Sequence, residues 1–223
     1  MKVALLIVRW HYRRFNMKNN LINRSYNFEV RATKSENRYT IQGMPIIYDS
    51  KTDLGFFAEV IERGALDKTD LKDVRFLVNH DTNKIPLARS RNNNKNSTMR
   101  LKPTDKGLEI EADLDVENNA DARSLYSAIE RGDISGMSFM FGVDDEEWED
   151  LDSDYPTRHI KSISTVVEVS AVTFPAYEAT TISARDKEAL ESAKSALDNA
   201  KRSLESEALK LEKLKLQILY GGN

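Results

Sequence analysis

The sequence contains no cysteine, which excludes disulfides, thiolate nucleophiles and cysteine-based zinc sites. This absence fits a reducing compartment. Glycine and proline are scarce, with 9 and 5 among 223 residues. No apolar run approaches the roughly 18 residues of a membrane span. The net charge of −3 implies no strong overall attraction to nucleic acid. What remains is a globular composition, 40% hydrophobic and 31% charged.

Residues 1–25 are predicted to be a leader or N-terminal extension. Its apolar run, Val3–Val8, is shorter than the core of a signal peptide, and basic and aromatic residues follow it. This pattern favours an extra β-strand, or an extension ahead of a start at Met17. A segment that touches a membrane is the third alternative.

Residues 26–183 carry a strand-rich pattern. Apolar residues alternate with charged ones from Leu108 to Val116, as in a strand with one buried and one solvent-exposed face. One helix is clear, with Asn118 or Asn119 as its cap and Gly132 as its stop. The pattern predicts a β-rich α+β domain, built as a closed or nearly closed β-barrel with one or more flanking helices.

Residues 184–223 form the third predicted unit, a long C-terminal helix. No glycine or proline occurs between Ala184 and Gly221. Apolar residues recur every seven positions, at Leu190, Leu197, Leu204, Leu211 and Ile218. This heptad pattern is typical of a coiled coil or a docked helix, and it favours self-association or partner binding over a helix packed only on its own domain.

Three polar residues interrupt apolar strands and are the candidate catalytic residues: Ser138, His80 and Glu168. A neutral imidazole can take the proton of a serine hydroxyl, and a carboxylate can orient the imidazole. Strand parity places Ser138 opposite the apolar Met137 and Phe139, so the apolar face would anchor the strand. The nucleophile elbow Gly-x-Ser-x-Gly is absent around Ser138.

Two alternatives remain open from the residues. His159 is a rival to Glu168 as the third catalytic member. A metal-dependent hydrolase using His80, Asp81, His159 and Glu168 is a weaker alternative. No motif for a cofactor, a P-loop or a His-Glu-x-x-His zinc site is present.

Four segments in order resemble the prohead proteases of tailed bacteriophages. They are Phe57–Leu66, Val78–Asp81, Ile134–Phe139 and Glu168–Ala176. The resemblance covers residues 26–183 and implies a serine endopeptidase with a barrel similar to herpesvirus assemblin. It maps His80 to the family's histidine, Ser138 to its nucleophile and Glu168 to its acidic member.

The resemblance also implies the partners and the location. The substrate would be scaffold protein or the scaffolding region of the major capsid protein, cleaved inside the assembling procapsid in the host cytoplasm. No cofactor, metal, nucleic acid or membrane is expected. The helical tail would act as a scaffold-like or targeting segment. The rival from another class is a non-enzymatic assembly protein built on a degenerate protease barrel.

Overall fold

The computed structural model describes residues 21–26, 30–35, 38–173 and 186–220. Most of the predicted leader therefore lies outside the described residues, and the predicted division into three units stays a prediction. Seven strands form the first sheet: β1 (Leu21–Tyr26), β4 (Lys51–Asp53), β5 (Ala58–Ile61), β6 (Arg75–Val78), β7 (Ala88–Arg89), β10 (Gly136–Glu149) and β11 (Thr157–Val172). Four form the second: β2 (Arg31–Ser35), β3 (Arg38–Ile47), β8 (Met99–Pro103) and β9 (Gly107–Leu114).

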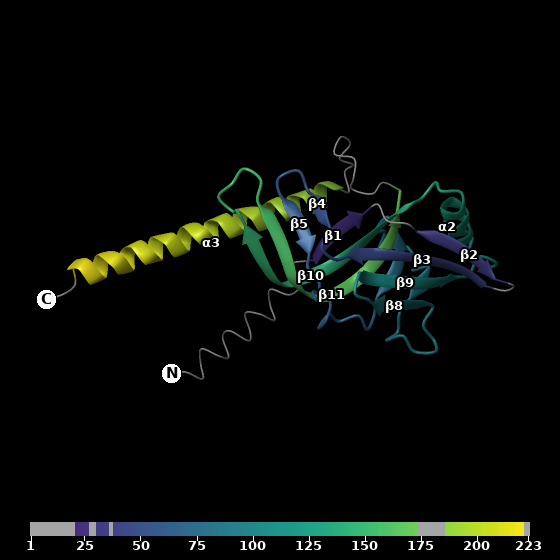
Figure 1. Ribbon diagram of the computed structural model, residues 1–223. Helices are drawn as coiled ribbons and strands as arrows, with labels where there is room; N and C mark the ends of the chain where they lie inside the picture. Colours follow the sequence, from purple (N-terminus) through teal and green to yellow (C-terminus); the bar gives the residue numbers. More distant parts are fainter. Residues whose placement is uncertain (1–20, 27–29, 36–37, 174–185, 221–223) are drawn as a thin grey trace.

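The long antiparallel pair β10–β11 is the spine of the first sheet (Figure 1). The first part of β11 pairs in parallel with β5, and its last part pairs in parallel with β6. β1 pairs with the other edge of β10. The second sheet packs against this spine through β3. Phe139 and Phe141 of β10 are fully buried, with their rings stacked 4.8 Å apart, so the core lies directly beneath the spine.

The prediction of a closed or nearly closed barrel is wrong. The first sheet runs in the order β1-β10-β11-β5-β4 with β6 and β7 as a branch, and the second runs β2-β3-β9-β8. Among the described strands no pairing joins the ends of either sheet. The reason lies in β11, which changes its parallel neighbour from β5 to β6, and in β10, whose register against β11 shifts at several bulges. Bulges bend a strand locally, so the sheet branches here and does not close.

Helix α2 (Ala120–Glu130) confirms the one helix expected within the strand-rich region. Asn119 is its N-cap, with a side-chain oxygen that accepts from the backbone N–H groups of Asp121 and Ala122 at 2.9 and 3.2 Å. Gly132 follows with φ of 80°, the left-handed conformation that ends helices. The helix packs on β2 and β9, and its Tyr126 meets Tyr39 of the neighbouring strand β3 edge to face at 5.2 Å.

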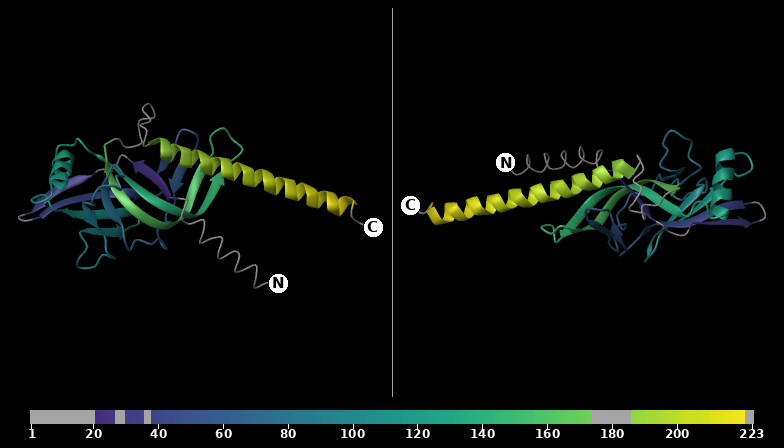
Figure 2. Two further views of the ribbon diagram at one scale, coloured as in Figure 1. Left: turned by 180° about the vertical axis from the view of Figure 1, so that it is seen from behind. Right: turned by 90° about the horizontal axis from the view of Figure 1, so that it is seen from above.

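Helix α3 (Asp186–Tyr220) confirms that the tail is one long helix. Its first half docks on the sheet region, where Leu197 packs in a small cluster with Phe57. Its second half extends away from the sheets (Figure 2). Leucines there are half-exposed, for example Leu211 at 54% and Leu214 at 53%. No described helix has the length and apolar character needed to cross a membrane.

A buried ion cluster ties β1 to β5 and β11. Glu59 is fully buried and accepts hydrogen bonds from Arg24 (Nη2 to Oε2, 2.9 Å) and Arg158 (Nη1 to Oε2, 3.1 Å). Arg158 also contacts Glu146 through Nε at 3.0 Å. Burial alone would raise the pKa of Glu59, but the charges and hydrogen bonds of Arg24 and Arg158 outweigh it and lower that pKa.

We expect Glu59→Ala to cost about 3–5 kcal/mol of unfolding free energy, because it leaves buried cations without their shared anion. Urea denaturation measures the loss. The matched control is Glu109→Ala, whose exposed pair with Lys102 is expected to contribute less than about 1 kcal/mol. A Glu59→Ala variant as stable as this control would contradict the expectation. Since the pKa of Glu59 is lowered on folding, its contribution is present above the ordinary carboxyl pKa and is lost as pH falls through the lowered value.

Candidate active site

His80 stands at the end of β6, in an unusual backbone conformation. Asn79 and His80 have φ angles of 51° and 57°, in the left-handed region that residues other than glycine seldom adopt. Asn79 is held to β11 by its backbone N–H on the Ala171 carbonyl at 2.9 Å. Its side chain donates to Thr173 Oγ1 at 3.0 Å and accepts from the Thr173 backbone N–H at 3.0 Å. We call these three hydrogen bonds the Asn79 clip. They hold the turn after β6 against the end of β11, so that His80 lies over β11.

Glu168 and His80 are in direct contact. His80 Nδ1 lies 2.5 Å from Oε1 of Glu168, a side chain that is almost fully buried. An ionised carboxylate only accepts hydrogen bonds, so Nδ1 carries the proton in the neutral imidazole and Nε2 is the acceptor. Nε2 is buried and has no hydrogen-bond partner among the described residues. The imidazole is therefore oriented by the carboxylate, with its basic nitrogen uncommitted.

Ser138 lies one strand away, on β10. It is directly opposite Ser170 of β11 in the register, and residues paired in this way share a face of the sheet. Ser170 Oγ in turn contacts both Glu168 Oε2 (2.5 Å) and the His80 backbone N–H (3.1 Å). The three predicted residues thus gather around Ser170.

Ser138 differs from expectation in two respects. It is fully buried, because both faces of β10 are covered at this point, whereas the parity argument left its face open. Its hydroxyl donates to the Arg24 carbonyl oxygen of β1 at 2.7 Å. No described hydrogen bond joins Ser138 to His80. For Ser138 to pass its proton to the imidazole, its hydroxyl must turn away from β1.

His159 is not near this cluster. It lies on β11 nine positions before Glu168, about 30 Å along the strand at 3.3 Å per residue. Its ring nitrogens face Glu62 at 3.0 Å and Glu149 at 3.3 Å. The four residues of the metal-dependent alternative are therefore not gathered in one place. Within the described ranges, no group of three or more His, Asp or Glu side chains is arranged to hold a metal ion.

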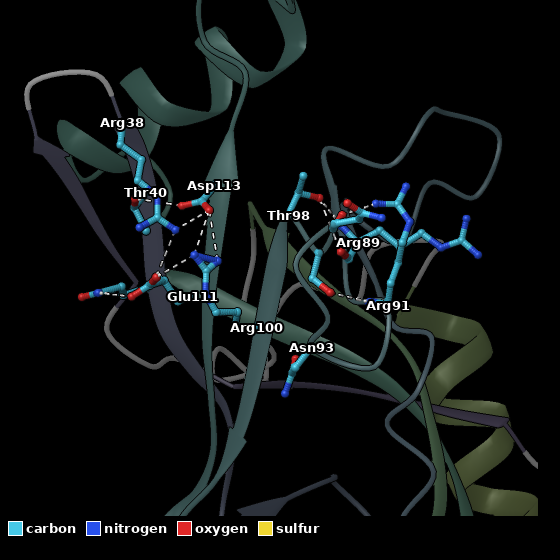
Figure 3. A network of polar contacts seen from close by, with 12 residues as sticks. Arg38, Thr40, Arg89, Arg91, Asn93, Thr98, Arg100, Glu111 and Asp113 are labelled. Atoms are coloured by element: carbon cyan, nitrogen blue, oxygen red, sulfur yellow. Dashed lines mark hydrogen bonds and ion pairs between the residues drawn. The ribbon is translucent and has the colours of Figure 1, made fainter.

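A second polar network lies on the four-stranded sheet (Figure 3). None of the residues labelled there is a candidate catalytic residue. Asp113 of β9 accepts hydrogen bonds from Arg38 at 2.5 Å, Arg100 at 3.1 Å and Thr40 at 3.2 Å. These side chains join neighbouring strands β3, β8 and β9. Because the arginines are about half exposed, each pair contributes little beyond fixing the strand register.

Sequence reasoning assigned no role to Ser170 or Asn79. The period-two pattern did place Ser170 on the same strand face as Glu168, so the sequence held a signal that Ser170 lies near the site. The clip formed by Asn79 depends on a left-handed turn at a strand end. Nothing in a run of strand-forming residues indicates that turn.

Comparison with known proteins identifies the family. Residues 26–195 match the sequence profile described as caudovirus prohead serine protease. Among solved structures, the capsid assembly protease gp21 of bacteriophage T4 is similar, with 12% identity and a TM-score of 0.41, over 69% of this chain and 97% of that one. No curated protein sequence gives a significant match. Since the profile spans well over half of the sequence, the chain belongs to the caudovirus prohead serine protease family.

Proposed function

We propose that this chain is a serine endopeptidase that matures the procapsid, with Ser138 as nucleophile, His80 as general base and Glu168 as the group that orients His80. One observation carries the proposal: the imidazole is held through Nδ1 by a buried carboxylate while Nε2 stays uncommitted. This is the arrangement that a proton-accepting histidine needs. The family's description supports the reaction class.

The chemistry proceeds in two halves. Ser138 Oγ attacks the carbonyl carbon of the scissile peptide, and its proton moves to Nε2 of His80. The imidazolium then protonates the leaving amine nitrogen as the C–N bond breaks, which leaves an ester on Ser138. A water molecule attacks the ester, His80 takes its proton, and the proton returns to Ser138 Oγ as the acid leaves. Glu168 stabilises the imidazolium in both halves.

The substrate we propose is scaffold protein, or the scaffolding region of the major capsid protein. The basis is the family's name, which places its members at the prohead stage of assembly. The enzyme would then act inside the assembling procapsid within the host cell.

A second candidate function is a non-enzymatic assembly protein that keeps the protease fold. The observation that favours it is the state of Ser138, which is fully buried and hydrogen-bonded to the Arg24 carbonyl. The two candidates differ in whether Ser138 Oγ can react with an electrophile.

The experiment that separates them is labelling with a fluorophosphonate, which reacts with activated serines, with and without excess chelator. We expect modification of Ser138, located by peptide mapping, and none in a His80→Ala variant. An unlabelled wild-type protein would support the assembly protein. A label on Ser170 would identify Ser170, and not Ser138, as the nucleophile. Labelling abolished by chelator would favour the metal-dependent alternative.

A further inference from the structure

We propose that Ser170 is a positioning residue that sets the geometry of both His80 and Glu168. This inference rests on the proposed function. Ser170 is fully buried, and its hydroxyl is hydrogen-bonded to both His80 and Glu168: it lies 2.5 Å from Glu168 Oε2 and accepts from the His80 backbone N–H at 3.1 Å. No described hydrogen bond joins it to the Ser138 hydroxyl, and it has no exposed surface, so its role is to orient and not to react.

The direction of each hydrogen bond follows from counting protons. A hydroxyl has one proton and two lone pairs. The carboxylate of Glu168 can only accept, so the Ser170 proton points to Oε2. A lone pair then receives the His80 backbone N–H. Because its proton is committed to the carboxylate, Ser170 is also a poor rival to Ser138 as nucleophile.

This arrangement uses both oxygens of Glu168. Oε1 holds the imidazole and Oε2 holds Ser170, so the carboxylate cannot rotate about its terminal bond without breaking a short contact. The same hydroxyl fixes the backbone of His80, next to the Asn79 clip. A single side chain therefore connects the position of the base to the orientation of its partner, across a turn whose left-handed residues need outside support.

The test is steady-state kinetics on Ser170→Ala with a peptide substrate cut by the wild-type protein. Loss of the outer hydrogen-bond partner of a metal-bound histidine or carboxylate typically lowers activity about 10–100-fold, and we take the same scale for this histidine–carboxylate pair. We expect that loss in kcat with KM unchanged, because Ser170 does not contact substrate. The matched control is Ser90→Ala. Ser90 is also fully buried, but its Oγ has no hydrogen-bond partner among the described residues, so kcat should not change.

A second readout distinguishes positioning from general stability. The proton between His80 Nδ1 and Glu168 should give a far-downfield NMR resonance, identified by its absence in His80→Ala. It should shift or broaden in Ser170→Ala and persist in Ser90→Ala. Ser170→Thr keeps a hydroxyl and should recover most of the turnover and the resonance.

Several outcomes would overturn the inference: an unchanged kcat and resonance in Ser170→Ala, a change confined to KM, or a Ser170→Thr variant as impaired as Ser170→Ala. If Ser170→Ala does not fold, Ser170→Thr is compared with the wild-type protein, and loss of turnover and of the resonance in folded Ser170→Thr would overturn the inference. A failure of the proposed function looks different, because the wild-type protein would then remain unlabelled by the fluorophosphonate whatever residue occupies position 170.

Discussion

Ser138→Ala is expected to lower turnover about a millionfold, the scale seen when a triad loses its nucleophile. Without Oγ no acyl-enzyme can form, and His80 has no hydroxyl to activate. The fold should survive, because the change removes a single atom and one hydrogen bond to the Arg24 carbonyl. A neutral hydrogen bond of this kind contributes about 0.5–1.5 kcal/mol. Activity and stability are therefore expected to separate in this variant.

Co-expression with the cognate capsid protein, followed by intact-mass analysis, measures this effect together with the cut site. Wild-type enzyme should shorten the capsid or scaffold protein, and Ser138→Ala should leave it at full length. Ser90→Ala serves as the control, since it removes a buried serine hydroxyl outside the cluster. Normal processing by Ser138→Ala would rule out this nucleophile.

Glu168→Gln is expected to lower kcat about 10⁴-fold, as happens when the carboxylate of a serine-protease triad becomes an amide. The carboxylate accepts from His80 Nδ1 and from Ser170 Oγ at once. An amide offers one accepting oxygen, so one of these donors loses its partner. The amide also carries no negative charge to stabilise the imidazolium that forms during attack. The base is thus both misoriented and weakened.

Pre-steady-state acylation by a chromogenic ester would measure this loss directly, because it reports the step in which His80 accepts the proton. Glu109→Gln on β9 is a suitable control, since that carboxylate is exposed and paired only with Lys102 in the described salt bridges. A Glu168→Gln loss of under about tenfold, equal to 1.4 kcal/mol in the barrier, would remove Glu168 from the catalytic set.

Local sequence patterns predicted much of the secondary structure. Asn119 and Gly132 mark the two ends of α2, and the sequence predicts both because capping involves only neighbouring backbone groups. The absence of glycine and proline after Ala184 predicted α3, and the structure confirms the helix. The coiled coil that the heptads predict, and self-association through it, stay predictions. Docking of Leu197 on Phe57 shows that the start of the helix has a partner within the chain.

The barrel prediction failed for a reason that no local pattern contains. Alternating residues identify strands and their faces, but closure depends on which strands pair across long separations. β11 pairs with both β5 and β6, more than 75 residues earlier in the chain, and it does so in parallel. The parallel pairing brings the end of β6, and with it His80, beside Glu168.

The sequence by itself determined the chemical types at the site and the strand faces they occupy, because side-chain alternation is a property of each strand alone. It favoured Glu168 as the partner of His80 and left His159 as a rival. Tertiary structure decided which of them contacts the imidazole, since strand register places Glu168 against the end of β6 and His159 beside Glu62. It also decided that Ser170 joins the cluster and that Ser138 is buried against β1, because both follow from pairings between distant segments.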